Sequence, residues 1–513
     1  MLSNAPQANT IGAALSRSAR KNASSIALKF EDRQWTYTEL ELAVNKVAHR
    51  LLQRGLRQGD RVVAYGKNSD AYVLTWLATV RAGLVHVPAN FSLNEDELRY
   101  IIGQSGARGL ISDVSLTATA ESATQGIDLQ VQGYFHSSSG AALDILQVAQ
   151  SDALSTEPQV VVNADDLAQF LYTSGTTGAP KAAMMTHQAF LAEYFACIVE
   201  LDIQSDEPML AALPLYHSAQ MHVFLMPALL KGASIRLMEG PVPDVCLQWI
   251  ELEGIVSFFA PPTFWISLLR HSDFERRNLS SLKKAYYGAS IMPVPVLEEL
   301  QQRLSGVGLY NCYGQSEIAP LATVLRPEDH ARRPASAGRP IITVETRVVD
   351  KDMNDVPTGE QGEIIHRSPQ LCKGYWQQPS MTAEAFKGGW FHSGDVGYID
   401  EEGYLYVVDR IKDVINSGGI IVASREVEEV LFTHPAVSEV AVVGMPHPKW
   451  IEAITAVVIL KENATATAED LIKHARQHLA SFKLPKQVIF STSLPKSTAG
   501  KILKRVLREE LQA

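Results

Sequence analysis

Hydrophobic and polar positions near the start of the chain alternate between two spacings. Residues 60–65 form a short apolar run typical of a buried strand, and an amphipathic helical pattern through Trp76 and Leu77 follows. Before this run, a strand ends near Trp35, and a helix is expected to start with Thr38 as its N-cap. Strands that alternate with helices over residues 28–90 predict an α/β fold with helical crossovers.

A different pattern occupies residues 338–410. Short alternating segments at 344–349, 363–366 and 404–408 are separated by turns rich in Gly, Pro and Asp, which predicts an antiparallel sheet or a small β-barrel-like subdomain. A chain of 513 residues is too long for one ordinary core. We therefore expect a large N-terminal domain of α/β subdomains and this β-rich subdomain, residues 1–409, followed by a small mobile α+β domain, residues 410–513.

Composition and charge exclude several classes of protein. The chain has 46% hydrophobic and 20% charged residues, as soluble globular proteins do, and a formal net charge of −10 that argues against a nucleic-acid partner. No apolar run reaches the roughly 18 residues of a membrane span, and the N-terminus has no apolar signal core. The four cysteines are far apart in sequence, so we expect a cytoplasmic protein without disulfides. The sequence leaves open whether chains associate into an oligomer.

The C-terminal part has a charge pattern of its own. Residues 410–513 carry 14 Lys and Arg against 11 Asp and Glu, and nine basic residues without an acidic one lie between Leu471 and Arg508. Such a run is typical of a cationic face that docks on an acidic partner lobe, or of a site for phosphate chemistry. Both interpretations stay open at this point.

The strongest chemical signal is residues 171–181, Leu-Tyr-Thr-Ser-Gly-Thr-Thr-Gly-Ala-Pro-Lys. A strand-like run leads into a loop whose glycines can turn backbone N–H groups onto phosphate oxygens, while hydroxyls donate hydrogen bonds and a lysine neutralises charge. The spacing differs from that of a Walker loop, which needs GxxxxGK followed by Ser or Thr. The predicted phosphate loop consists of Thr173, Ser174, Gly175, Thr176, Thr177, Gly178 and Lys181.

Four further motifs follow in order: Tyr-Gly-Gln-Ser-Glu at 313–317, Trp-Phe-His-Ser-Gly-Asp at 390–395, Asp-Arg-Ile-Lys-Asp at 409–413 and Pro-Lys-Ser-Thr-Ala-Gly-Lys at 495–501. With the phosphate loop they make the whole chain resemble the adenylate-forming superfamily of acyl-CoA synthetases, peptide-synthetase adenylation domains and luciferases. Residues 213–220 and 286–293 are similar to bacterial fatty-acyl-CoA synthetases. The resemblance implies that ATP activates a carboxylic acid as acyl-AMP, that pyrophosphate leaves, and that the acyl group then passes to a second substrate.

The resemblance also implies roles for the matching positions. Thr173 and Glu317 would hold Mg²⁺, which prefers oxygen ligands. Asp395 and Arg410 would bind the ribose of ATP, and Lys501 would bridge the substrate carboxylate and the α-phosphate, with Lys181 and His217 as further catalytic candidates. The other nucleotide-binding positions are Gly288, Ala289, Ser290, Asn311, Cys312, Tyr313, Gly314 and Ser316.

The acyl pocket is expected to be apolar. His217 matches a position that lines or gates this pocket, and the alternative is a histidine satisfied within the core. Because no cation offers itself to a second substrate carboxylate, we expect a largely apolar monocarboxylic acid, with Gly288 and Gly314 leaving depth for a chain or ring. The predicted pocket consists of His217, Met221, Phe259, Tyr287, Gly288, Gly314, Ile318 and Ala319.

The acceptor of the acyl group stays open. Relatives that use CoA rotate the small domain, and the resemblance places the hinge at Lys412. Two isoleucines stand where the family usually has a polar pair, so the acceptor is either CoA, as in fatty-acyl-CoA ligases, or the amine of an amino acid, as in a coronafacate-ligase-like amide synthetase. Retention of Lys181 and Lys501 opposes a third alternative, an inactive nucleotide-binding scaffold. The predicted acceptor channel consists of Gly418, Gly419, Ile420, Ile421 and Trp450.

Overall fold

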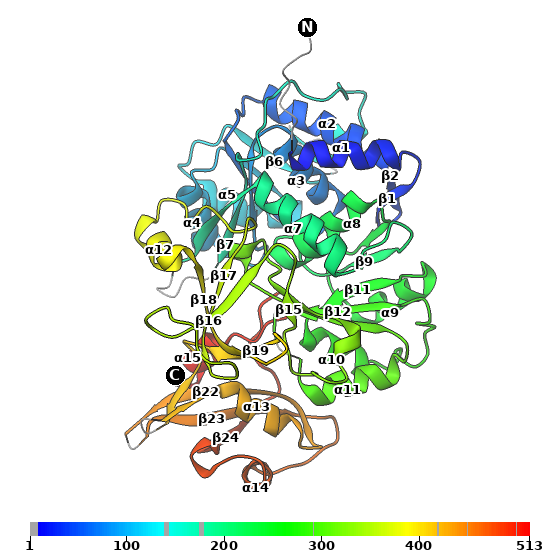
Figure 1. Ribbon diagram of the computed structural model, residues 1–513. Coiled ribbons are helices and arrows are strands. Elements are labelled where there is room, and N and C mark those ends of the chain that lie inside the picture. The colour runs from blue at the N-terminus through cyan, green and yellow to red at the C-terminus, as the bar shows by residue number, and fades with distance from the viewer. Residues whose placement is uncertain are drawn as a thin grey trace.

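The computed structural model describes residues 9–137, 143–173, 179–290, 292–417, 420–448, 450–498 and 500–512. Four sheets organise this described part of the chain. Three lie in a large N-terminal part, and the fourth lies in a smaller C-terminal part, orange and red at the bottom of Figure 1. The predicted α/β fold class, with a large N-terminal and a small C-terminal part, is confirmed.

The first sheet has six strands in the order β6-β5-β3-β4-β7-β8. These strands are β3 (Arg61–Tyr65), β4 (Val85–Ala89), β5 (Gly109–Ser112), β6 (Val131–Tyr134), β7 (Leu167–Thr173) and β8 (Lys181–Thr186). The pairings from β6 to β7 are parallel, and β8 is antiparallel to β7. This is the parallel sheet that the alternating pattern predicts.

Helices cover both faces of this sheet. They are α1 (Ile11–Lys21), α2 (Tyr37–Gln53), α3 (Asp70–Arg81), α4 (Glu95–Ser105), α5 (Thr117–Thr124) and α6 (Ile145–Gln150). Alternate residues of β3 point to opposite faces. Val62 and Ala64 pack in one core cluster with α2 and α3, whereas Val63 and Tyr65 pack in another with α4 and α5.

Two local predictions for this region were wrong. The N-cap of α2 is Thr36 and not Thr38, because Thr36 and Glu39 exchange the reciprocal hydrogen bonds of a capping box. The helix through Trp76 is not amphipathic, because every residue of α3 is buried. This helix lies among α1, α2, α6 and the sheet, so it has no solvent-facing side that would need polar residues.

The second sheet has nine strands in the order β15-β14-β13-β12-β11-β9-β10-β1-β2. These strands are β1 (Ile26–Phe30), β2 (Arg33–Thr36), β9 (Met209–Ala211), β10 (Ile235–Leu237), β11 (Ser257–Ala260), β12 (Lys284–Gly288), β13 (Gly308–Tyr313), β14 (Thr323–Leu325) and β15 (Arg339–Pro340). Its central strands, β13 to β1, are parallel. The helices of this region are α7 (His187–Glu200), α8 (Met226–Lys231), α9 (Pro243–Leu252), α10 (Pro262–Arg270) and α11 (Val294–Arg303).

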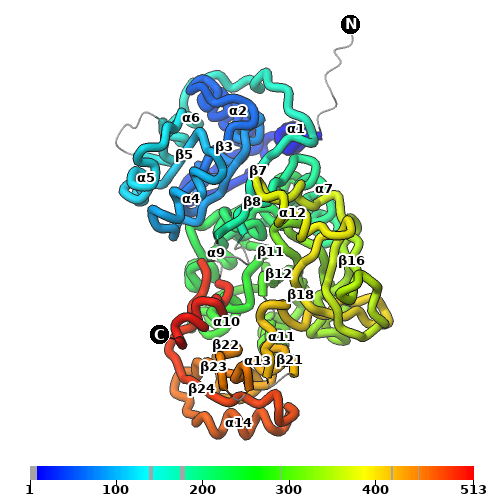
Figure 2. The backbone as a smooth tube through the Cα atoms, turned by 90° about the vertical axis from the view of Figure 1, so that its left-hand side faces the viewer, coloured from blue at the N-terminus to red at the C-terminus, as the bar shows by residue number. Residues whose placement is uncertain are grey.

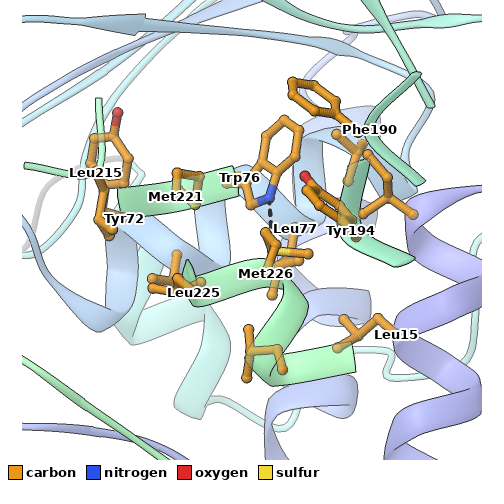
Figure 3. Close-up of a cluster of buried hydrophobic side chains, with 14 of the residues drawn as sticks. Leu15, Tyr72, Trp76, Leu77, Phe190, Tyr194, Leu215, Met221, Leu225 and Met226 are labelled. Carbon is orange, nitrogen blue, oxygen red and sulfur yellow. Dashed lines mark hydrogen bonds between the residues drawn. The ribbon is translucent and has the colours of Figure 1, made fainter. Parts of the chain in front are cut away.

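A large apolar cluster joins the first and second sheets (Figure 3). Trp76 of α3 lies at its centre and donates its indole N–H to the sulfur of Met226 at 3.3 Å. Phe190 and Tyr194 of α7 pack nearby, and Met221 comes from a π-helix, η2 (Ala219–Leu225). A π-helix is rare and often marks a functional region, and this one begins two residues after His217.

The third sheet is antiparallel, as predicted, in the order β16-β17-β18-β19. Its strands are β16 (Glu345–Val349), β17 (Gly362–Arg367), β18 (Phe391–Ile399) and β19 (Leu405–Arg410), with α12 (Pro379–Ala385) before β18. The fourth sheet, in the order β21-β20-β23-β22 with β24 beside β23, starts directly after β19. The predicted boundary between residues 409 and 410 therefore falls at the end of β19, and it stays a prediction.

The fourth sheet forms the smaller part together with three helices. Its elements are β20 (Ile415–Ser417), β21 (Ile420–Val422), β22 (Val437–His447), β23 (Ile451–Leu460), β24 (Gln487–Phe490), α13 (Ser424–Phe432), α14 (Ala468–Arg476) and α15 (Lys504–Gln512). Figures 1 and 2 both show this part at one end of the molecule, opposite the N-terminus. In the described part of the chain, no helix combines the length and apolar character that crossing a membrane requires.

The basic run of the smaller part pairs mainly with carboxylates of that same part. Its ion pairs are Lys483–Glu426 (2.5 Å), Lys496–Glu439 (2.6 Å), Lys504–Glu428 (2.7 Å) and Arg508–Asp413 (2.9 Å). The interpretation of the run as a face that docks on an acidic partner lobe is therefore not supported.

Candidate active site

Strands β7 and β8 bring the two ends of the predicted phosphate loop together. Thr173 is the last residue of β7 and lies opposite Lys181, the first residue of β8. The intervening loop residues, Ser174, Gly175, Thr176, Thr177 and Gly178, lie outside the described residues. Antiparallel pairing thus closes the loop at its base and holds its flanking hydroxyl and ammonium groups at one edge of the sheet.

Glu317 approaches this edge from η3 (Ser316–Ile318). Its Oε1 atom accepts a hydrogen bond from Thr173 Oγ1 at 3.1 Å, and Lys181 Nζ lies 4.0 Å from the same oxygen. Among the described residues, no donor contacts Oε2 of Glu317, and no three His, Cys, Asp or Glu side chains gather as a metal site. The hydroxyl and carboxylate oxygens fit Mg²⁺, which typically binds through one or two carboxylates plus water and substrate phosphates. We name the contacts of Thr173, Lys181 and Glu317 the phosphate corner.

Tyr375, in the loop before α12, completes the phosphate corner. Lys181 Nζ donates to its hydroxyl at 2.6 Å, and the hydroxyl donates to Glu317 Oε1 at 2.9 Å. The ammonium also lies 3.9 Å from the centre of the phenol ring, a distance typical of a cation–π contact. Sequence reasoning missed Tyr375, because a tyrosine after a turn glycine carries no signal until distant segments are brought together.

Asp395 and Arg410 lie opposite each other on β18 and β19. Arg410 Nε is 3.2 Å from Oδ1 of Asp395. The other oxygen, Oδ2, accepts hydrogen bonds from Tyr313 Oη at 2.8 Å and Gln315 Nε2 at 2.9 Å. Burial and the Asp395 carboxylate raise the pKa of Tyr313, so its phenol keeps the proton that it donates. Gln315 lies inside a quoted motif, yet no role was predicted for it.

Strands β12 and β13 position the predicted adenine slot. Gly288 lies opposite Cys312, and a Cβ atom on Gly288 would be 2.3 Å from the carbonyl oxygen of Cys312. A Cβ atom on Gly314 would be 1.9 Å from the carbonyl oxygen of Pro320. Backbone therefore fills the space beside both glycines. The expectation that they leave depth for a chain or ring was wrong, because their small size is needed for close backbone packing.

The other predicted nucleotide-binding residues flank this slot. Asn311 Nδ2 donates to the carbonyl oxygen of Ser336 at 2.8 Å. Ala289, at the end of β12, has a left-handed φ of 64° and is exposed, and Ser290 follows it. Ser316 and Ser218 have their hydroxyl oxygens 3.0 Å apart. This contact ties the loop that carries Glu317 to the segment that carries His217.

Lys501 reaches the same region from the smaller part. Thr263 Oγ1 on α10 donates to the carbonyl oxygen of Gly500 at 2.8 Å. Gly500 has φ of 79°, and a Cβ atom there would be 2.7 Å from Thr263 Oγ1, so a glycine lets the loop approach this closely. Burial and the charge of Arg410 lower the pKa of Lys501 to about 8, and Asp395 opposes the shift. The charges of Arg410 and Asp395 thus act on the Lys501 ammonium, in opposite directions.

The same ammonium influences His217. Burial and the charge of Lys501 lower the pKa of His217 to about 4, so this imidazole is neutral near pH 7. The charge of Lys501, from the smaller part, thus acts on a histidine of the large part.

Most of the predicted acyl wall lies in one core cluster. Met221, Phe259, Ile318 and Ala319 are buried members of it. Tyr287 is separated from Phe259, because Phe259 pairs with Tyr286 across β11 and β12, which leaves Tyr287 on the opposite face of the sheet. There Tyr287 packs in a second cluster. The structure therefore does not bring Tyr287 together with the rest of the predicted wall.

Among the predicted hinge and acceptor residues, Lys412, Ile420 and Ile421 are exposed. Lys412 is in the turn between β19 and β20, and burial and Arg410 lower its pKa. Ile420 and Ile421 on edge strand β21 are 47% and 61% exposed. The ring of Trp450, at the turn between β22 and β23, lies 4.4 Å from that of His447. Gly418 and Gly419 lie outside the described residues.

Comparison with known families decides the identity. The profile of the AMP-binding enzyme family matches residues 15–376, and that of the AMP-binding enzyme C-terminal domain matches residues 426–501. The chain belongs to the AMP-binding enzyme family. It is thus an ATP-dependent, acyl-adenylate-forming ligase, and the resemblance to the adenylate-forming superfamily is confirmed.

Relatives of this AMP-binding enzyme include ligases with different acceptors. A feruloyl-CoA synthase of Amycolatopsis sp is 36% identical over 493 residues, which cover 96% of this chain and 97% of the relative. The anthranilate CoA ligase AuaEII, solved with anthranoyl-AMP, is 27% identical with a TM-score of 0.91, covering 99% of this chain and 98% of that one. The amide bond synthetase McbA of Marinactinospora thermotolerans is 28% identical with a TM-score of 0.87, covering 98% and 99%.

Proposed function

We propose that this AMP-binding enzyme activates an aromatic, largely apolar carboxylic acid as its acyl-AMP and passes the acyl group to the thiol of CoA. The observation that carries this proposal is the position of Lys501. The Gly500–Thr263 hydrogen bond holds it where its charge acts on His217 and on the Asp395–Arg410 pair. Adenylation requires a cation that acts on both the acid and the nucleotide, and this supports the role proposed for Lys501.

The first half-reaction brings anions together. The substrate carboxylate attacks the α-phosphate of ATP, the bond to the β-phosphate breaks, and pyrophosphate leaves. Lys501 would bridge the attacking carboxylate and the α-phosphate, and fixed cations are effective where charge develops. Asp395 would accept the ribose hydroxyls, with Arg410 and the Tyr313 and Gln315 donors holding its orientation. Because His217 is neutral near pH 7, it would line the acyl pocket without repelling Lys501.

Mg²⁺, when bound, would neutralise the phosphate oxygens. Thr173 and Glu317 would hold it, since Glu317 Oε1 is fixed by Thr173 and Tyr375 while Oε2 meets no donor among the described residues. Lys181 would pair with phosphate oxygens beside it. The protein mainly positions and screens the reacting groups, as in other phosphoryl-transfer sites.

The aromatic acid and the CoA acceptor are proposed from the relatives. Feruloyl and anthranoyl groups are both aromatic, and both relatives are named as acting with CoA. The buried apolar residues Met221, Phe259 and Ile318 suit such a ring. We also propose that residues 1–409 and 410–513 are the two domains and that Lys412 is the hinge about which the smaller one turns before acyl transfer.

A second candidate function is amide formation. It is favoured by Ile420 and Ile421, which offer no polar side chain to the amides of a pantetheine arm, and by the likeness to McbA. In that case an amine, rather than a thiol, would attack the acyl-adenylate, and AMP would leave in the same way.

One assay series separates these functions. The enzyme is incubated with ATP, MgCl₂ and benzoate, cinnamate, ferulate or decanoate, and pyrophosphate release is measured before CoA or glycine is added. We expect release with the aromatic acids above that with decanoate, and a thioester with CoA in the mass spectrum. If none of the four acids supports pyrophosphate release, the proposal is overturned. Formation of an amide without a thioester would establish the second candidate.

A further inference from the structure

Tyr375 stands between the two charged groups of the phosphate corner. Its hydroxyl accepts from Lys181 Nζ at 2.6 Å and donates to Glu317 Oε1 at 2.9 Å. The direction of both hydrogen bonds is fixed, because an ammonium group can only donate and a carboxylate can only accept. The one hydroxyl therefore hydrogen-bonds to both charged groups, and it lies between them.

The distances show what would happen without this hydroxyl. Lys181 Nζ is 4.0 Å from Glu317 Oε1, whereas a direct charge-assisted hydrogen bond between such groups is about 2.7–2.9 Å long. A shift of about 1 Å by a flexible lysine would close that gap. Because both side chains are largely buried, a direct pair would be weakly screened and persistent.

A direct pair would weaken both halves of the corner. The ammonium would neutralise the Glu317 carboxylate that a cation needs, and Lys181 would give up the charge that a phosphate needs. In the observed geometry, Thr173 and Tyr375 both donate to Oε1 of Glu317, and among the described residues no donor contacts Oε2.

We propose that Tyr375 is a positioning residue whose hydroxyl acts as a spacer, holding Lys181 and Glu317 apart so that each stays available to Mg²⁺-bound ATP. This inference rests on the proposed function, because it takes ATP and Mg²⁺ to bind at the phosphate corner. A phenylalanine ring would keep the cation–π contact with Lys181. The separation of Lys181 from Glu317 is therefore attributed to the hydroxyl, and Tyr375→Phe tests it by removing that oxygen atom alone.

The test compares wild type with Tyr375→Phe by ligand-induced thermal stabilisation. At a fixed ATP concentration, MgCl₂ is titrated and the rise in Tm is followed, which needs neither acid nor acceptor. We expect Tyr375→Phe to need about tenfold more MgCl₂ for half of the effect, as loss of a charge-assisted hydrogen bond predicts. Tyr37→Phe is the matched control, since Tyr37 is a buried phenol that hydrogen-bonds to Leu229 and Ala233 far from the site, and its MgCl₂ midpoint should equal that of wild type.

Removing the lysine distinguishes a spacer from a residue that merely supports Glu317. If the defect of Tyr375→Phe comes from a Lys181–Glu317 pair, adding Lys181→Met should restore the MgCl₂ midpoint to that of Lys181→Met alone. A double variant that stays as impaired as Tyr375→Phe, or an unchanged midpoint in Tyr375→Phe, would overturn the spacer. If ATP and MgCl₂ do not stabilise the wild type at all, the proposed function itself fails.

Discussion

The phosphate corner and the predicted acceptor strand differ in how completely their side chains are satisfied. At the phosphate corner, Glu317 Oε1 receives two hydrogen bonds, and Lys181 is held by both the hydroxyl and the ring of Tyr375. On β21, by contrast, Ile420 and Ile421 are 47% and 61% exposed at the edge of a sheet. The charged groups of the phosphate corner are thus held by hydrogen bonds, whereas β21 exposes apolar side chains that no other described residue covers.

This contrast bears on which half-reaction the observed arrangement fits. The smaller part presents Lys501 to the large part through the Gly500–Thr263 contact, while β21 faces solvent. Exposed apolar side chains at a sheet edge are unfavourable unless another surface covers them in some state. We infer that the arrangement fits adenylation, and that β21 is used only after the smaller part has turned.

The largest expected effect is the loss of adenylation when Lys501 is replaced. Lys501→Ala should lower the rate of pyrophosphate release about 10²–10³-fold, the usual cost of losing one group that stabilises developing charge. ATP should still raise the Tm of the variant, because the phosphate corner and Asp395 are intact. Lys473→Ala, which removes a lysine on α14 of the same part, serves as the control. Release at a rate near that of wild type would exclude Lys501 from the chemistry.

The second prediction concerns the pH dependence that follows from the lowered pKa of Lys501. The folded-state pKa of Lys501 is lowered to about 8, so in the free enzyme the required ammonium loses its proton above that pH. The kcat/KM for ATP in pyrophosphate release should therefore fall about tenfold per unit above pH 8. His217, with a pKa lowered to about 4, stays neutral throughout this range. Lys501→Arg should lower the overall rate but remove the alkaline fall, and a fall that survives the arginine would come from another group.

The candidate site could be proposed from the sequence because its residues lie in local motifs. Thr173 and Lys181 flank one loop, whereas Asp395 lies within β18 and Arg410 ends β19. Asp395 and Arg410 lie in short motifs for which the family resemblance already implied a shared role. The β-strand alternation also predicted the antiparallel sheet. Motifs and strand alternation are local patterns, so they can be recognised without knowledge of tertiary contacts.

What escaped prediction depends on contacts between distant segments. The role of Tyr375 is visible only once the loop before α12 pairs with β8. The role of Gly288 is visible only once the carbonyl of Cys312 is seen to fill the space beside it. Tyr287 was predicted to line the acyl pocket, yet it lies on the opposite face of the sheet from Phe259. The side of a buried parallel strand on which a residue lies cannot be read from a uniformly apolar run.

A third prediction separates adenylation from acyl transfer by hindering rotation of the smaller part. Lys412→Pro fixes φ near −65° at the proposed hinge, which should hinder rotation. We expect acyl-adenylate to form within about twofold of the wild-type rate while transfer to CoA slows about tenfold, as for hinge variants in general. The two steps are measured by pyrophosphate release and by single-turnover thioester formation. Lys412→Ala should leave both unchanged, and an equal loss of both steps in Lys412→Pro would indicate a folding defect instead.

The smallest expected effect concerns the acceptor strand itself. If β21 lines the acceptor passage after rotation, its two isoleucines offer a pantetheine arm only backbone groups, and their branched side chains are stiff. Ile420→Glu combined with Ile421→Asn would supply polar partners for the amides of that arm. The ratio of thioester to amide from one acyl-adenylate, at matched CoA and glycine concentrations, should then rise about threefold, roughly the worth of one net hydrogen bond. Ile342→Asn changes an isoleucine that is 73% exposed on the large part and should leave this ratio unchanged. A ratio that does not move in the double variant would show that the isoleucines do not line the passage, and the apolar edge would then serve only the packing of the smaller part.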